Sequence, residues 1–352
     1  MNLPESILHN IPWDQSANSI WPASCFFLHR NISNHSFPSK LSHSQSEELL
    51  ETLKTTFLNL QELKEPSHIP ADLLGAQEKE FLCEHFLGQE GWQTAGKGQA
   101  FVFDSSAKFL ALLNFQDHLL LQLIDCKGEW GEAWNTLNKI EESIGKQLTY
   151  AFCPRFGYLT SDPKKSGIGL LVVCYLHLPG LIASKTLSSV LEANKIPSVE
   201  TLGLLGNMEE MVGDFLVLKN NYTLGLTEEA ILNDLHKTAV HLIFSEKAQR
   251  LQYKETSPPE IKDAISRAYG LLMHSYQLET QEALNALSQI KLGIDLGWVK
   301  GISDEELNEI FFRCRRAHIM HSDQKISLDK KELAHARAEH LHEKLKKIEL
   351  TF

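Results

Sequence analysis

The stretch KETSPPEIKD (254–263) constrains the fold of this chain more than any other part of its sequence. Its two prolines end a preceding helix, and the Glu and Asp that follow them favour the first turns of a new one. Before this stretch, strand-like and helix-like patterns are mixed, whereas after it the pattern is helical with breaks at glycine. We therefore expect an α+β region with an antiparallel sheet, followed by a small all-helical domain.

Local patterns place the elements of these two regions. Apolar residues at helical spacing predict four main helices before the break: 42–63, 76–87, 131–148 and 227–253. Ser44 or Ser46 can cap the first of them. Runs typical of strands occupy four segments: 99–105, 109–124, 168–178 and 212–224. We expect three parts in the chain: a loose N-terminal segment (1–20), one α+β domain (21–253) and a helical domain (259–352).

Composition argues against several classes of function. A net charge of −11 argues against a nucleic-acid partner, because neutralising phosphates requires a basic face. The longest apolar run, around 170–174, has the length of a strand, and the first residues lack the cationic start of a secretory signal. The six cysteines include no CxxC pair, and the sixteen histidines form no ligand motif. We therefore expect a cytoplasmic protein without a metal site or a membrane partner.

A turn rich in glycine, proline and lysine leads into an apolar strand in FGYLTSDPKKSGIGLLVVCYLHLPGL (156–181). The backbone N–H groups at its glycines and the ammonium groups of Lys164 and Lys165 are suited to hold an anion. A loop that handles phosphate normally works with arginines, because their planar guanidinium groups form bidentate bonds to phosphate oxygens. The strand after this turn carries no charge from Leu170 to Gly180.

Five groups of segments resemble bacterial protein-arginine kinases, which are members of the ATP:guanido phosphotransferase (phosphagen kinase) family: NFQDH, FGYLTSDPKKSGIGL with LHLPGL, LGLLGN with GDFLVLKNNYTLG, EKAQR, and KLGIDLGWVKGI. The resemblance runs from about residue 23 to the C-terminus. It implies a small helical N-lobe up to about residue 95 and a catalytic lobe with an antiparallel sheet flanked by helices. It also implies a C-terminal all-helical domain that mediates dimers and binds phosphoarginine.

The same resemblance implies which positions would carry the chemistry. The family motifs SSRxRLARN, NEEDHxR, GTGxRAS and RGxxGE correspond here to ASCFFLHRN, NFQDHLL, GIGLLVV and LGLLGN. The five arginines that clamp the nucleotide are thereby replaced at these positions: Cys25, Phe27, Leu120, Leu171 and Leu202. Phe115 and Asn207 replace the two catalytic carboxylates, and Asp162 stands at the position of the substrate-facing cysteine.

No catalytic residue of the family is thus retained, and the nucleotide-binding positions are present in degenerate form. Those family-equivalent positions are Ser24, Cys25, Phe26, Phe27, Leu28, Leu120, Leu171, Val172, Val173, Cys174, Tyr175, Leu202, Gly203, Leu204, Leu205, Gly206 and Asn207. Remaining candidates for anion contacts are Lys164, Lys165 and the outer Arg30. In the C-terminal domain, the phosphoarginine motif RDxxRA corresponds to DKKELA (329–334), without its arginines.

Two classes of function follow from the resemblance. The first is a pseudokinase that needs no cofactor and serves as a binding or regulatory module. The second is a still-active phosphotransferase that uses Mg-ATP. The family's partners are a second copy of the chain, a small zinc-binding activator protein and a Clp-type chaperone ATPase.

Adjacent Asp117 and His118 suggest an acid–base pair, but neighbouring residues of a strand point to opposite faces, so we expect one to be structural and one to face solvent. We expect His177 to be a satisfied core histidine, and Arg250 to be a solvated or salt-bridged group on a helix surface.

Overall fold

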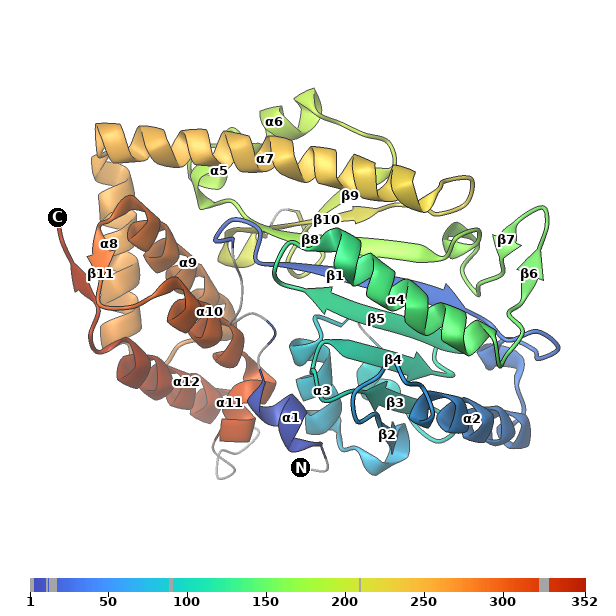
Figure 1. Cartoon of the computed structure of the whole chain (residues 1–352). Coiled ribbons are helices and arrows are strands. Elements are labelled where there is room, and N and C mark those ends of the chain that lie inside the picture. The colour runs from blue at the N-terminus through green and yellow to red at the C-terminus, as the bar shows by residue number, and fades with distance from the viewer. Residues whose placement is uncertain (1–2, 11, 13–17, 89–90, 209, 323–328) are drawn as a thin grey trace. The chain divides into compact units, whose positions relative to one another are not determined.

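The computed structural model describes residues 3–10, 12, 18–88, 91–208, 210–322 and 329–352 (Figure 1). The chain forms two compact units, which we describe one at a time. The first comprises Met1–Pro12, Ala23–Val173 and Lys219–Leu235, and the second comprises Trp13–Pro22, Cys174–Leu218 and His236–Phe352.

One eight-stranded sheet has the strand order β2-β3-β4-β5-β1-β8-β10-β9. Its strands are β1 (Ala23–Arg30), β2 (Ser67–Pro70), β3 (Ala100–Phe103), β4 (Phe109–Leu113), β5 (Leu119–Asp125), β8 (Leu170–His177), β9 (Val199–Gly203) and β10 (Phe215–Asn220). From β2 to β1, every neighbouring pair is antiparallel. The predicted fold class is therefore confirmed. β6 (Phe152–Cys153) and β7 (Gly157–Tyr158) form a separate two-stranded hairpin.

The antiparallel register determines which side chains share a face of the sheet in the first unit. His29 of β1 lies opposite Leu120 of β5, and Phe27 lies opposite Gln122. Because directly paired residues point to the same side, these four side chains share one face. Leu112 of β4 pairs with Leu120 and extends that face across the sheet.

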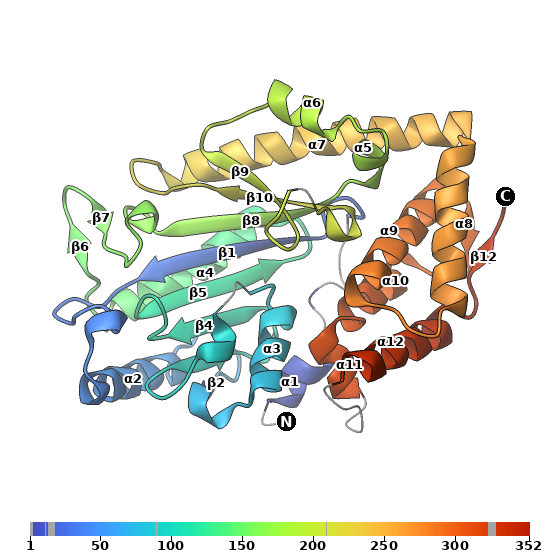
Figure 2. The same cartoon turned by 180° about the vertical axis from the view of Figure 1, so that it is seen from behind.

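The helices of the first unit include α1 (Glu5–His9), α2 (His43–Leu58), α3 (Ala76–His85) and α4 (Trp130–Gly145), and two of them, α4 and α3, cover opposite faces of the sheet. Trp130 of α4 packs edge-on against Phe26 at 5.6 Å between ring centroids, and its Nε1–H donates to Ser24 Oγ at 3.0 Å. Helix α4 therefore covers the face opposite His29. The view from behind shows α3 over the other face (Figure 2), where the side-chain amide of Gln122 donates to the carbonyl of Phe86.

Several local predictions need correction. The run 109–124 forms two strands, because Asn114 adopts a positive φ of 58° and its N–H closes a tight turn onto the carbonyl of His118 at 3.0 Å. The stretch up to residue 95, expected to be a helical lobe, also supplies β1 and β2 to the sheet. Ser42 caps α2 in place of the two predicted serines. The segment expected to be loose contains α1, with Ile7 buried, while residues 13–17 lie outside the described residues.

Helices make up most of the second unit. These are α5 (Pro179–Ala183), α6 (Leu187–Ala193), most of α7 (Glu228–Thr256), α8 (Pro259–His274), α9 (Thr280–Leu296), α10 (Asp304–Arg313), α11 (Arg316–Ser322) and α12 (Lys330–Leu345), with a short pair of strands, β11 (Val299–Lys300) and β12 (Glu349–Leu350). Helix α8 begins at Pro259, the second of the two prolines that mark the break in the sequence, and Pro258 is its N-cap. Among the described residues, none of the helices has both the length and the apolar content needed to cross a bilayer.

Candidate functional site

A cavity of about 320 Å³ in the first unit brings together three of the predicted site positions. Phe115, Leu120 and Lys165 line it, although 50 residues separate the first from the last. Its walls divide by chemistry: an apolar part formed by Trp92, Leu112, Phe115 and Leu120, and a polar part formed by His29, Gln116, Asp117 and Lys165. The cavity lies where β1 and β5 meet the turn between β4 and β5.

The sheet register divides the predicted positions on β1 between two faces. Cys25 and Phe27 share the face of Leu120, and both are almost fully buried. The other predicted positions of this strand, Ser24, Phe26 and Leu28, point to the opposite face, toward α4 in the case of Ser24 and Phe26. Only part of this predicted set therefore shares the face that carries the cavity.

Strand β8 shows the same alternation. Leu171 and Val173 are slightly more exposed, at 7% and 5%, than Leu170 and Val172, at 0%. The first pair therefore shares one face of the strand. The strand starts beside β1, because the N–H of His29 donates to the carbonyl of Gly169 at 2.9 Å. Gly169 has a φ of +70°, and a Cβ there would come within 2.7 Å of the His29 carbonyl oxygen, so this close approach requires glycine.

The remaining predicted positions belong to the second unit: Cys174, Tyr175, Leu202, Gly203, Leu204, Leu205, Gly206 and Asn207. Leu202 and Gly203 end strand β9, and Leu205 is 66% exposed in the turn that follows. Convergence of Leu202 with Cys25, Phe27, Leu120 and Leu171 on one pocket remains a prediction.

A buried pair of His29 and Asp117 forms the polar end of the cavity. His29 Nδ1 lies 2.9 Å from Asp117 Oδ2, and the two residues are 3% and 1% exposed. Burial alone would raise the pKa of Asp117, but hydrogen bonds from His29, Ser161 and Asn31 outweigh it and hold the pKa below its usual range. Burial lowers the pKa of His29. The carboxylate is therefore ionised, the imidazole is neutral, and Nδ1–H donates to Asp117.

The second ring nitrogen of His29, Nε2, faces the cavity. Among the residues that the structure describes, none donates to or accepts from Nε2, and the ring lines the cavity. In the tautomer set by Asp117, Nε2 carries a lone pair. The cavity therefore contains a hydrogen-bond acceptor held in place by a buried carboxylate.

His118 takes no part in this pair, as predicted, although Asp117 and His118 lie in the turn before β5 and not within a strand. Its Nδ1 accepts the backbone N–H of Ile32 at 2.9 Å, and its Nε2 contacts the carbonyl oxygen of Ser36 at 2.9 Å. Burial lowers the pKa of His118 to about 4. The expectation that Asp117 or His118 faces solvent was wrong, because both are buried.

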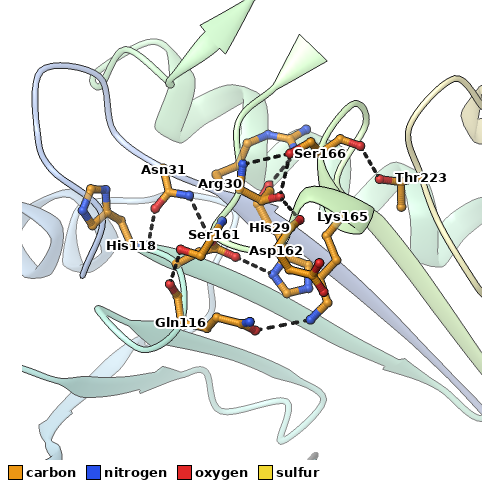
Figure 3. A network of polar contacts seen from close by, with 12 residues as sticks. His29, Arg30, Asn31, Gln116, His118, Ser161, Asp162, Lys165, Ser166 and Thr223 are labelled. Carbon is orange, nitrogen blue, oxygen red and sulfur yellow. Dashed lines mark hydrogen bonds and ion pairs between the residues drawn. The ribbon is translucent and has the colours of Figure 1, made fainter. Parts of the chain in front are cut away.

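Lys165 sits in a loop that hydrogen bonds fix to its neighbours. The N–H of Ser161 donates to Asp117 Oδ1 at 2.7 Å, and its hydroxyl donates to the carbonyl of Gln116 at 2.6 Å. On the other side of the loop, the Thr223 hydroxyl donates to the carbonyl of Ser166 at 2.6 Å. Lys165 Nζ reaches Gln116 Oε1 at 3.4 Å (Figure 3), the one side-chain hydrogen bond that the described residues give it.

The two other candidates for anion contacts differ from Lys165. Lys164 is exposed and lies outside the cavity lining. Arg30 is 4% exposed, and its Nε donates to Glu141 Oε1 at 2.7 Å while Nη1 donates to the carbonyls of His29 and Ile168. Its guanidinium also stacks 3.6 Å from the centroid of the Tyr158 ring. These partners make Arg30 a structural group that joins β1 to α4, and the anion contact expected there is withdrawn. Asp162 caps the turn by accepting the N–H of Lys164 at 3.0 Å.

Sequence reasoning missed His29 and Trp92. The signal for His29 was available: in ASCFFLHR, a period of two places Cys25, Phe27 and His29 on one face. Its pairing with a carboxylate 88 residues away was not visible locally. No group of three or more His, Cys, Asp or Glu suited to a metal ion occurs within the described ranges.

Solved structures with a similar fold are phosphagen kinases. The chain matches lombricine kinase with a TM-score of 0.56 at 19% identity, over 71% of this chain and 72% of that one. It also matches the duplicated taurocyamine kinase from Schistosoma mansoni with a TM-score of 0.58 at 19% identity, over 68% of this chain and 35% of that one. These likenesses define the class of fold, that of the phosphagen kinases.

Sequence comparisons define the family. Residues 46–249 match the model of the ATP:guanido phosphotransferase C-terminal catalytic domain, and residues 258–351 match that of the protein-arginine kinase McsB C-terminal domain. A protein-arginine kinase of Chlamydia pneumoniae is 37% identical over 97% of both chains. One of Brevibacillus brevis is 31% identical over 91% of this chain and 90% of its own. The chain belongs to the ATP:guanido phosphotransferase family, among the bacterial protein-arginine kinases.

Proposed function

We propose that this chain is a catalytically degenerate protein-arginine kinase that acts as a binding or regulatory module in protein quality control. The observation that carries the proposal is the chemistry at the family's site positions. Cys25, Phe27, Leu120 and Leu171 offer one thiol and three hydrocarbon side chains where the resemblance expects arginines. Phe115, which lines the cavity, stands where the resemblance expects the catalytic glutamate.

These residues do not fit Mg-ATP, the nucleotide that the family implies. A triphosphate leaving water must recover its hydration from fixed donors, and burying unpaired charge costs several kcal/mol. Loss of one transition-state arginine lowers the rate by about 10³–10⁵, and loss of a general base lowers it by about 10²–10⁴. Such losses are not additive, but two of them together remove any useful rate.

A second candidate function is retained phosphoryl transfer to protein arginine. The observation that favours it is the name of the relatives, since the 37%-identical chain of Chlamydia pneumoniae is called a protein-arginine kinase. In this chain, such activity would have to use Mg-ATP without the family's arginines, and Lys164 and Lys165 are point charges that lack the bidentate fork of arginine.

One experiment separates the two candidates. The purified chain is incubated with Mg-ATP and a model protein, and phosphoarginine is measured by mass spectrometry, with the Brevibacillus brevis relative assayed in parallel. We expect no phosphoarginine, and calorimetry should show only weak, salt-sensitive nucleotide binding. Leu171→Arg alone should not restore activity, because position 115 would still lack a carboxylate. Phosphoarginine above background, or low-micromolar affinity for Mg-ATP, would overturn the first proposal.

As a module, the chain needs partners. We propose a second copy of the chain through the helical domain, and we propose a zinc-binding activator protein and a Clp-type chaperone ATPase as further partners. The support is the match of residues 258–351 to the family's C-terminal domain model. Light scattering at micromolar concentration tests self-association, and a monomer there would contradict it.

A further inference from the structure

The cavity around His29, Asp117 and Lys165 has the size of a binding site for a small organic molecule. Its volume of about 320 Å³ falls at the lower end of the range typical of ligand pockets, about 300–1,000 Å³. Trp92 and Phe115 give it flat apolar walls. Such pockets hold a ligand by apolar contact and orient it by a few polar groups.

Charges within the cavity are not equally available. Asp117 already accepts three hydrogen bonds, from Asn31 at 2.7 Å, Ser161 at 2.7 Å and His29 at 2.9 Å, so its two oxygens are engaged. Lys165 is half-buried, and its ammonium has one long contact at 3.4 Å to the uncharged side chain of Gln116. Burial lowers the pKa of Lys165, and the nearby carboxylates of Asp162 and Asp117 partly oppose that effect.

His29 adds the second polar contact. Its Nε2 is an acceptor whose orientation the Asp117 contact fixes, so a ligand hydroxyl or N–H group can donate to it. A guanidinium or amidinium would instead require an accessible carboxylate. Among the described lining residues the carboxylate is that of Asp117, which already accepts three hydrogen bonds, and Lys165 repels a cation.

We propose that this cavity binds a small organic anion with a flat apolar body, whose carboxylate pairs with Lys165 and whose hydroxyl or N–H group donates to His29. The charge preference of this cavity is thus the reverse of that needed to bind a guanidinium. This inference deepens the proposed function and rests on it in one respect: the cavity no longer serves a guanidinium substrate.

Three ligands of one shape and different charge test the preference. They are 4-hydroxybenzoate, 4-hydroxybenzamide and 4-hydroxybenzamidine, which carry charges of about −1, 0 and +1 at pH 7. Calorimetry on the full chain without nucleotide should show the benzoate binding about tenfold or more tightly than the amide, because a charge-assisted hydrogen bond replaces a neutral one. The amidine should bind most weakly.

Variants assign the preference to Lys165. Lys165→Gln should weaken benzoate binding about tenfold and leave amide binding within about twofold. Lys164→Gln is the matched control, since this neighbouring lysine is exposed and lies outside the lining, and it should leave both affinities unchanged. Phe115→Glu places a carboxylate in the cavity and should reverse the order of benzoate and amidine. Unchanged melting temperatures would show that each variant folds.

Three outcomes would overturn the inference: amidine binding as tight as benzoate binding, equal effects of the two lysine substitutions, or no binding of any of the three ligands at millimolar concentration. The result is independent of the phosphoarginine assay. Catalysis together with anion binding would reject the proposed function and the loss of the guanidinium substrate, but would leave the anion site standing. Neither catalysis nor anion binding would reject this inference alone.

Discussion

Two buried histidines, one in each unit, differ in what surrounds their second ring nitrogen. In the first unit, His29 donates to Asp117 and leaves Nε2 open to the cavity. In the second unit, His177 lies 2.7 Å through Nε2 from the hydroxyl of Ser288, which donates to Asp214 at 2.5 Å. Arg250 Nη2 lies 3.4 Å from His177 Nδ1, so both nitrogens of this ring have partners.

The difference separates a scaffold from a site. Both rings are buried, and burial lowers the pKa of both, so neither burial nor pKa distinguishes them. The two histidines differ in how many ring nitrogens have a hydrogen-bond partner. A fully bonded network stabilises one core arrangement, whereas an oriented but unused acceptor is available to a ligand.

The largest loss of stability should come from disrupting the buried hydrogen-bond network around His177 at Arg250. Its Nε donates to Glu246 Oε1 at 2.6 Å, and its other nitrogens contact Asp295 and the carbonyl of His177. Arg250→Met should cost about 3–5 kcal/mol of unfolding free energy, because it leaves buried carboxylate uncompensated. Urea denaturation measures the cost.

Arg267→Met is the control for that substitution. Arg267 forms an ion pair with Asp263 at 2.7 Å, but its side chain is 80% exposed. Its loss should cost at most about 0.5 kcal/mol. Equal costs for the two arginines would mean that the buried hydrogen-bond network around His177 does not stabilise the fold. The expectation that Arg250 lies on a helix surface needs correction in one respect: it is salt-bridged as expected, but only 7% exposed.

The dependence of stability on pH tests a third buried histidine, His118, whose two ring nitrogens also have hydrogen-bond partners. Its pKa is about 4 in the folded chain and has its ordinary value of 6.5 in the unfolded chain. The unfolded chain therefore takes up the proton first, and stability falls as pH drops from about 6.5 to about 4. The loss is at most about 3.5 kcal/mol, since one pKa unit corresponds to about 1.4 kcal/mol.

Unfolding midpoints at pH 7, 5.5 and 4.5 check this dependence. His118→Gln should be less stable at pH 7 but should show a shallower fall with acid. An identical slope in the parent chain and the variant would assign the acid sensitivity to other groups, among them His29 and His177.

The smallest expected effect is the difference in stability cost between substituting His177 and substituting His29. His177→Gln should cost about 1–2 kcal/mol more than His29→Gln, because it disrupts bonds at both nitrogens in a sealed core, whereas His29→Gln removes one bond beside a cavity. Asp117 retains Asn31 and Ser161 as donors in the second variant. Denaturant midpoints of the two variants decide the point, and a larger cost at His29 would contradict the distinction.

The sequence predicted features that depend on residues close together in the chain better than those that depend on distant residues. The antiparallel sheet and the core role of His177 were confirmed, because alternation and apolar runs are local signals. The single strand over 109–124 was wrong, since the run is apolar on both sides of a turn that depends on the positive φ of Asn114. Arg30 was misassigned because Glu141, its partner, lies 111 residues away. The cavity itself depends on pairings between distant strands, which no local pattern contains.

The fixed loop that carries Lys165 has a consequence for the rate of binding. Ser161 joins it to the turn between β4 and β5, and Thr223 joins its other end to the start of the segment after β10. The loop therefore already holds Lys165 at the cavity, and binding requires no closure of this loop. Binding should follow a single exponential whose rate rises linearly with ligand concentration, without a plateau. The association rate constant should be about 10⁵ M⁻¹s⁻¹ or higher.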